Sequence, residues 1–218
     1  MLGTVRRPET GDACIDDIVG EAGGGRDRIT VDRVDLADAA SIEAFVARVS
    51  SEGPIDALVV AAAPFDEVPI DEVDYGGFVE QAGVQAAGPA MLAIGLRDAL
   101  AAGREGAGGA VVFFGDVHAR LRPRSGALAY LAGKAMLESL VPLLGIELAP
   151  VRVFGIAPGV IAWADGFDEA RRAAHLARVP LARAGTVEEA AALVDSMIDA
   201  MTYTTGIVVP IDGGRSLR

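Results

Sequence analysis

Cysteine and aromatic residues are scarce in this chain of 218 residues. Its single cysteine, Cys14, excludes an internal disulfide and suits a reducing compartment. Aromatic residues make up 5% of a sequence that is 51% hydrophobic, so aliphatic side chains must fill most of the core. The length suits one α/β domain, and no repeat or linker-like segment divides it. We therefore expect residues 1–218 to form a single domain.

Basic residues are outnumbered, and the formal net charge is −12. A nucleic-acid partner is not expected, because neutralising phosphates requires a clustered basic surface. The N-terminus has no apolar segment typical of a secretion signal, and the longest apolar run, Ala86 to Leu96, is too short to cross a bilayer. These absences predict a soluble, cytoplasmic protein without a membrane partner. No metal site is predicted.

Lysine is almost absent, because 18 of the 19 basic residues are arginines. The single lysine, Lys134, could be a chance survivor, or it could lie where a compact ammonium is needed. It ends the segment Tyr130-Leu-Ala-Gly-Lys134, whose helical pattern places both side chains on one face. An ammonium close to a phenol lowers the phenol pKa toward neutrality, which would let Tyr130 transfer a proton. The same motif also occurs in helices as a solvated polar pair.

Strand-like and helix-like segments alternate along the chain, which predicts an α/β fold with a doubly wound parallel sheet. Strands are predicted at Leu2–Val5, Ile29–Val34, Ala57–Ala62, Ala110–Phe114, Arg152–Ile156 and Ile207–Ile211. Helices are predicted at Ala13–Glu21, Ala39–Ser51, Asp74–Ala102, Ala127–Leu148, Phe167–Ala177 and Val187–Met201. Thr186 and Glu189 form a capping-box pattern at the start of the last helix.

Five further motifs accompany the Tyr130–Lys134 pair. They are Asp35-Leu36, Ala157-Pro158-Gly159-Val160-Ile161, Val179-Pro-Leu-Ala-Arg183, Val187-Glu-Glu-Ala190 and Ile211-Asp-Gly-Gly214. In this order the chain resembles the short-chain dehydrogenase/reductase (SDR) family over nearly its whole length. The resemblance implies a Rossmann-like fold and a nicotinamide cofactor, with Tyr130 as general acid and Lys134 as its electrostatic tuner and ribose ligand. By the same resemblance Asp35 and Leu36 meet the adenine, and Pro158, Gly159 and Ile161 hold the nicotinamide carboxamide.

Within the family, three features are similar to bacterial pteridine reductases: Gly115-Asp116-Val117-His118-Ala119, Ile161-Ala-Trp163 and Asp212-Gly-Gly-Arg-Ser216. By that resemblance Asp116 replaces the usual serine, orients the substrate and relays protons to Tyr130. The alternative is a carboxylate that only caps a turn. The Asp116–Tyr130 spacing is one residue longer than the family pattern, which an insertion within residues 120–125 could absorb. Neither histidine is a predicted catalyst: His118 should lie in a loop and His175 at the surface.

The family's first strand and its T-G-x-x-x-G-x-G loop, which cradles the pyrophosphate, are missing. The segment Met1–Pro8 instead resembles the second strand of an NADPH-dependent member, where Arg6 or Arg7 would meet the 2′-phosphate; two solvated arginines are the alternative. Without a first strand, the second and fourth family strands could close the gap, or residues 2–5 could take the central place. We favour a third explanation, a preceding segment lost through a misplaced start, over real loss.

Two further departures affect the cofactor pocket. The family's Asn-Asn-Ala-Gly turn is here Val60-Ala61-Ala62-Ala63, so the side-chain amides that brace the cofactor pocket in the family are missing at this turn, which includes Ala61 and Ala62. The asparagine of the catalytic tetrad corresponds to Gln85, which is one methylene longer. We therefore expect weak cofactor binding in the chain as it stands.

The leading hypothesis is an NADPH-dependent SDR oxidoreductase that reduces a small carbonyl or pterin-like substrate. The alternatives are a non-catalytic SDR-fold partner subunit and a cofactor-free isomerase or dehydratase. The resemblance also implies a homo-oligomer built on four chains, or a heteromer with a homologue, with small residues along the helix at 74–102 allowing close approach.

Overall fold

The computed structural model describes residues 2–5, 30–61, 64–65, 67–163 and 168–218. The described strands are β1 (Leu2–Val5), β2 (Thr30–Arg33), β3 (Ala57–Val60), β4 (Ala110–Phe114), β5 (Arg152–Pro158) and β6 (Ile207–Ile211). The α-helices are α2 (Ala39–Glu52), α3 (Tyr75–Ala82), α4 (Gly88–Gly95), α5 (Arg97–Ala101), α6 (Val117–Arg120), α7 (Leu128–Glu147), α8 (Glu169–Leu176) and α9 (Val187–Asp199). All six predicted strands are confirmed within a few residues. The predicted helix Ala13–Glu21 lies outside the described residues, as do Arg6, Arg7 and Ala62.

The described strands form two parallel sheets rather than one. Strand β1 pairs with β2 from Leu2 opposite Thr30 to Val5 opposite Arg33. The other sheet has the order β3-β4-β5-β6. Among the described strands, β3 is hydrogen-bonded only to β4, so two of the expected solutions to the missing strand are wrong. Residues 2–5 do not take a central place, and the flanking strands do not close the gap.

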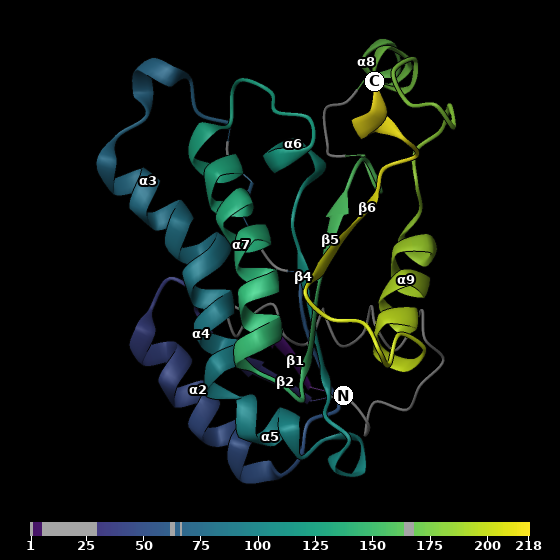
Figure 1. Ribbon diagram of the computed structural model, residues 1–218. Coiled ribbons are helices and arrows are strands. Elements are labelled where there is room, and N and C mark those ends of the chain that lie inside the picture. Colours follow the sequence, from purple (N-terminus) through teal and green to yellow (C-terminus); the bar gives the residue numbers. More distant parts are fainter. Residues whose placement is uncertain (1, 6–29, 62–63, 66, 164–167) are drawn as a thin grey trace.

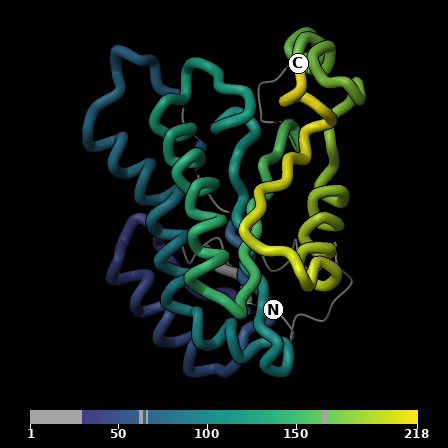
Figure 2. The backbone as a smooth tube through the Cα atoms, in the orientation of Figure 1, coloured from purple at the N-terminus to yellow at the C-terminus, as the bar shows by residue number. Residues whose placement is uncertain are grey.

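Helices cover both faces of the four-stranded sheet, as the doubly wound prediction requires (Figures 1 and 2). Successive side chains of a strand point to opposite faces, and β4 divides its residues accordingly. Val111 and Phe113 belong to the core that includes Leu137 and Val141 of α7. Ala110 and Val112 instead belong to the smaller core that includes Met197 of α9. The sheet is therefore buried on both faces, which explains why its strands read as continuous apolar runs.

Two glycines allow α4 to approach α2 and the segment that precedes it. A Cβ at Gly88 would overlap with the backbone carbonyl of Leu36, and one at Gly95 would come within 2.8 Å of Cγ2 of Val46. Helix α2 itself begins at Asp38, whose side chain accepts the backbone N–H of Ala40. The β1–β2 unit thus meets the rest of the fold through a helix–helix contact.

The predicted helix Asp74–Ala102 exists, but it is interrupted. Asp74 caps α3, a π-helical turn, η4 (Gly83–Ala87), follows, and α4 continues after it. Such turns insert one extra residue per turn and are frequent at functional sites. Here the turn carries Gln85, whose side chain is 1% exposed.

Helix α7 is the longest of the described helices, and most of its residues are apolar. By length and composition it alone of them could cross a membrane, although 44% of its most apolar stretch is buried inside the fold. It also holds two buried charged residues, Lys134 and Glu138. These features are typical of the central helix of a core.

A buried arginine joins the far end of the sheet to α9. Arg152, at the start of β5, donates from Nη1 to the carbonyls of Met197 (2.9 Å) and Met201 (3.2 Å) and from Nη2 to that of Ile198 (2.9 Å). The carbonyls of Met197 and Ile198 lie in the last turn of α9, where carbonyls have no partner along the helix itself, and that of Met201 lies just beyond it. At the other end, the predicted capping box of Thr186 and Glu189 is confirmed.

Candidate active site

Asp116 follows β4 and starts α6, at the carboxyl end of the parallel strands. Its Oδ1 accepts the backbone N–H of His118 at 2.7 Å, which caps α6. Its Oδ2 accepts the Tyr130 hydroxyl at 3.2 Å. The predicted capping role is therefore confirmed for Oδ1, and the hydrogen bond of Oδ2 brings Asp116 to the Tyr130 hydroxyl.

Tyr130 lies in the first turn of α7 and is 8% exposed. The edge of one ring meets the face of the other in its contact with Phe65, with ring centroids 5.0 Å apart. The expected lowering of its pKa is wrong for this structure: burial, and then the charge and hydrogen bond of Asp116, raise the Tyr130 pKa well above the ordinary value. The phenol is therefore held in its protonated form.

Lys134 does not hydrogen-bond the phenol. Its Nζ lies 5.8 Å from the centroid of the Tyr130 ring and donates to the backbone carbonyl of Phe114 at 2.6 Å. Burial lowers the Lys134 pKa to about 8, although the carboxylates of Asp116 and Glu138 partly oppose the shift. An ammonium with one of its three protons on Phe114 keeps donors for further partners.

Glu138 lies one turn beyond Lys134, and no role was predicted for it. Its side chain is 3% exposed, and Oε1 accepts the backbone N–H of Asp116 at 3.1 Å. A Cβ at Gly115 would overlap with this carboxylate, so glycine is required there for the close approach. Burial raises the Glu138 pKa. The spacing of four residues from Tyr130 to Lys134 to Glu138 was the available signal, because it places all three on one helical face.

Gln85 packs against α7 but does not join the Tyr130–Asp116 pair. Its Nε2 donates to the carbonyl of Pro64 (2.8 Å) and to Oε1 of Gln81 (3.0 Å). Its own Oε1 is buried without a hydrogen-bond partner among the described residues. Gly133 of α7 allows the approach, because a Cβ there would come within 2.8 Å of the Gln85 Cβ. An unpaired, buried acceptor beside the catalytic helix is available to a bound water or ligand.

Of the expected nucleotide-binding residues before the Tyr130 helix, Asp35, Leu36 and Ala61 are among the described residues. The Asp35 carboxylate accepts the backbone N–H of Ala37 at 3.0 Å, and Leu36 packs against the main core. Ala61 is exposed directly after β3.

The turn after β5 is a close backbone approach. Pro158 ends the strand, and the Gly159 N–H donates to the carbonyl of Ile211 at 3.0 Å. A Cβ at Gly159 would come within 3.0 Å of Asp212, and Ile161 lies against Gly185. Together with the free donors of Lys134, these residues fit the nicotinamide and ribose half of a dinucleotide. The fit of the phosphates depends on residues outside the described part of the chain.

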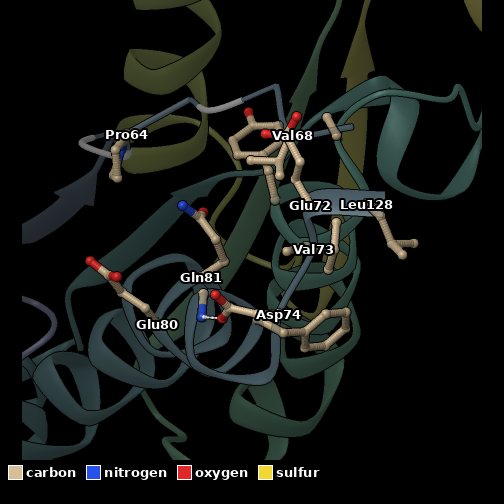
Figure 3. A pocket seen from close by; sticks show the side chains of 13 residues that line it. Pro64, Val68, Glu72, Val73, Asp74, Glu80, Gln81 and Leu128 are labelled. Carbon is tan, nitrogen blue, oxygen red and sulfur yellow. Dashed lines mark hydrogen bonds between the residues drawn. The ribbon is translucent and has the colours of Figure 1, made fainter. Parts of the chain in front are cut away.

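A cavity of about 310 Å³ opens beside Tyr130, between α3 and the start of α7. Figure 3 shows the carboxylates of Glu72, Asp74 and Glu80 around it, with Leu128 on the α7 side. Asp74 also caps α3 by accepting the Gly77 N–H at 2.7 Å. The hollow is large enough for a small molecule, and its lining is acidic.

His175 is half-buried rather than fully exposed at the surface. Its Nε2 is buried without a partner in the described structure, and its ring meets that of Trp163 edge to face, with centroids 5.7 Å apart. The prediction that His118 lies in a loop is wrong, because it belongs to α6, where its Nδ1 is 2.8 Å from the Arg122 carbonyl. Arg215, which received no role from the sequence, is also buried and is 5% exposed.

These features define a class of protein: a parallel α/β fold with a tyrosine, a lysine and a carboxylate at the carboxyl edge of its sheet. A family model described as enoyl-(acyl carrier protein) reductase matches residues 8–216. The chain belongs to the short-chain dehydrogenase/reductase family of NAD(P)-dependent oxidoreductases.

Three curated relatives illustrate the range of similarity. An uncharacterized oxidoreductase of Schizosaccharomyces pombe is 30% identical over 193 residues, which is 84% of this chain and 72% of the relative. The protein FixR of Bradyrhizobium diazoefficiens is 39% identical over 132 residues, 59% of this chain, and the match spans about half (46%) of FixR. Dihydromonapterin reductase of Klebsiella pneumoniae is 37% identical over 92 residues, 42% of this chain and 38% of that protein.

Among solved structures, a short-chain type dehydrogenase/reductase from Mycobacterium ulcerans superposes with a TM-score of 0.86. The superposition covers 100% of this chain and 80% of the other at 23% identity. It supports the fold alone.

Proposed function

We propose that this chain reduces a small carbonyl or pterin-like compound with NADPH, and that Tyr130 is the general acid. The observation that carries the proposal is the 3.2 Å hydrogen bond from the Tyr130 hydroxyl to Asp116. It lies at the carboxyl edge of the parallel sheet, where α/β proteins bind their ligands. A reduction needs an acid that arrives with its proton, and the raised pKa of Tyr130 keeps the phenol protonated at neutral pH.

Reduced nicotinamide, when bound, supplies a hydride to the carbonyl or imine carbon. Tyr130 donates its proton to the substrate oxygen or nitrogen as negative charge develops there. Lys134 then stabilises the phenolate that remains on Tyr130. Asp116 orients the Tyr130 hydroxyl before the transfer and relays a proton back to it afterwards. Glu138 holds the Asp116 backbone in place through the 3.1 Å hydrogen bond.

The finer assignments rest on sequence. Arg6 and Arg7 are proposed to favour NADPH over NADH, because a guanidinium pairs with the 2′-phosphate in a bidentate manner. The partial match to dihydromonapterin reductase and the aspartate at position 116 support a pterin-like substrate. The single cysteine supports a reducing, cytoplasmic location, and the length without a linker-like segment supports a single domain.

An oligomer is proposed on the basis of an apolar surface along α4 and α7, which pack against each other. Exposed side chains there are Met91, Ile94, Met136, Leu143 and Ile146. Residues three or four apart on a helix share a face, so these side chains can bury a continuous patch in a two-fold contact. Light scattering coupled to gel filtration tests this: a species of 22.4 kDa at micromolar concentration would contradict it.

The test of the reaction is a screen of small ketones, aldehydes and dihydropterins with NADPH and with NADH, in which nicotinamide absorbance is followed. We expect NADPH to be consumed faster than NADH, and the Tyr130→Phe variant to be inactive. A titration of nicotinamide fluorescence measures cofactor affinity separately. Lack of turnover across the panel, with a cofactor that binds, would contradict the proposal.

A further inference from the structure

The C-terminal turn η6 (Arg215–Leu217) buries a guanidinium without using all of its donors. Arg215 is 5% exposed, and its Nε and Nη1 have no acceptor among the described residues. A buried donor that loses its water and gains no protein partner is unfavourable, and the cost is greater for a charged group. Structures that keep such a group usually supply it with an anion.

The surroundings of Arg215 are cationic. Burial, and then the charges of Arg122 and Arg178, lower the Arg215 pKa. His175 is affected in the same way, since burial and then Arg215, His118 and Arg178 lower its pKa and favour the neutral ring. Its buried Nε2 also has no partner in the described part of the chain. This region therefore holds two polar side chains, Arg215 and His175, with buried atoms that have no hydrogen-bond partner among the described residues, together with several positive charges. The net charge of the whole chain, in contrast, is −12.

The nearest opposing charge is largely committed elsewhere. Asp212 raises the Arg215 pKa, but its Oδ1 accepts the Gly214 N–H at 2.8 Å and its Oδ2 accepts the Ser216 N–H at 2.6 Å. Asp212 thus fixes the shape of the turn that presents Arg215. It does not occupy the free guanidinium donors.

Three segments surround Arg215, and one of them, α6, starts at Asp116. Turn η6 packs against α6, which starts at Asp116 and leads to His118 and Arg122. The segment after α8, which carries Arg178, is joined to the same turn by the hydrogen bond from Leu181 N to the Gly213 carbonyl at 3.1 Å. The cationic groups therefore lie on the α6 side of Asp116, whereas the acidic cavity lies beside α3.

Trp163 gives the region a fixed wall. Its ring meets His175 edge to face, and the guanidinium of Arg172 lies 5.5 Å from its centroid. These contacts hold the imidazole beside Arg215 without using Nε2. In the tautomer with a proton on Nε2, His175 adds a neutral donor to the charged donors of Arg215.

We propose that Arg215, together with His175 and Arg178, binds the acidic group of the substrate, a carboxylate or a phosphate. The proposal rests on the reductase function above and names its substrate class: a small carbonyl compound with an anionic group. The planar fork of a guanidinium matches the two oxygens of either anion. An anion bound here lies on the α6 side of Asp116, the residue that starts this helix.

Binding is tested without turnover. Inorganic phosphate and acetate are titrated into the protein in a buffer free of other oxyanions, and the midpoint of thermal unfolding is followed. We expect saturable stabilisation by at least one of them, and which one distinguishes phosphate from carboxylate. Arg215→Met should weaken the apparent affinity at least tenfold. The matched control is Arg171→Met on the exposed face of α8, which should bind as the native chain does.

The result is separable from the reductase proposal. If phosphate or acetate stabilises the native chain and not Arg215→Met, the anion site stands even where no reduction is found. If neither anion has a saturable effect, or if Arg215→Met binds as tightly as the native chain, the proposal is wrong. A fall in molecular mass of Arg215→Met with unchanged anion affinity would also overturn it, because a partner chain would then supply the acceptor. In the reductase assay, the variant should raise KM at least tenfold for a 2-oxo acid or a phosphorylated ketone, and less for a neutral ketone.

Discussion

The Tyr130 hydroxyl donates to Oδ2 of Asp116, while Oδ1 of the same carboxylate caps α6. A helix cap fixes the carboxylate, and the carboxylate fixes the phenol. The arrangement also keeps the phenol protonated, because a phenolate facing a carboxylate would be repelled. Tyr130 is therefore arranged as a donor, and it needs an added positive charge or a developing negative charge on the substrate before it gives up its proton.

Tyr130→Phe should lower reductase activity by about 10²- to 10⁴-fold, the usual contribution of a positioned acid. Because one hydrogen bond is lost from a ring that stays packed, the free energy of unfolding should fall by about 1 kcal/mol or less. Steady-state kinetics and urea unfolding measure the two effects. Full activity in a folded variant would rule out Tyr130 as the acid.

Lys134 makes stability depend on pH in a predictable direction. Its folded-state pKa of about 8 lies below the ordinary value of 10.5, so between these values the unfolded chain binds more protons than the folded one. The free energy of unfolding of the native chain should therefore rise with pH over this window, relative to Lys134→Met, by on the order of 3 kcal/mol. Urea unfolding of both proteins across this range measures it. Parallel pH profiles would show that the ammonium is not desolvated.

Gly115→Ala should be destabilising because its new methyl group overlaps with the Glu138 carboxylate. We expect a cost of about 1–3 kcal/mol, typical of overpacking in a core. Adding Glu138→Ala should recover part of this cost, so that the two changes are not additive. A suitable control is Gly83→Ala, where a Cβ meets no atom within 4 Å. Additive effects of the two changes would show that the residues do not interact.

Arg152→Met should remove the donors that the last carbonyls of α9 use. A loss of about 3 kcal/mol in the free energy of unfolding is expected, because several buried acceptors are left unpaired together. Arg152→Lys should restore only part of it, since one ammonium cannot replace the fork that reaches three carbonyls. Chemical denaturation measures both. Arg97→Met, at an exposed position, should leave stability nearly unchanged.

The sequence predicted the strands well and the environment of the Tyr130–Lys134 pair poorly. Buried parallel strands can be recognised in a sequence as apolar runs, and β4 and β6 match their predicted bounds. The spacing of Tyr130 and Lys134 correctly placed them on one helical face. It could not show that the ammonium turns to the Phe114 carbonyl, since that depends on how β4 passes under α7.

Residues distant in sequence account for the other differences. Glu138 contributes to the site because it contacts Gly115, and Arg215 because of the groups packed around η6. These contacts join residues distant in sequence, so no local pattern predicts them. The π-helical turn at Gln85 was likewise not predicted. The capping role of Asp116 was predictable, because it follows from a carboxylate placed after a strand.

The separation of β1–β2 from the other sheet has a mechanical consequence. A continuous sheet transmits a displacement sideways through its ladder of hydrogen bonds, but none of the described strands connects β2 to β3 in this way. The Asp35–Leu36 turn and α2 pack on the half of the fold that carries Tyr130, and α4 approaches Leu36 at Gly88 and Val46 at Gly95. Gly88 and Gly95 are the points at which α4 approaches the β1–β2 half of the fold. A larger side chain at either one would displace the β1–β2 unit as a body and leave every strand pair intact.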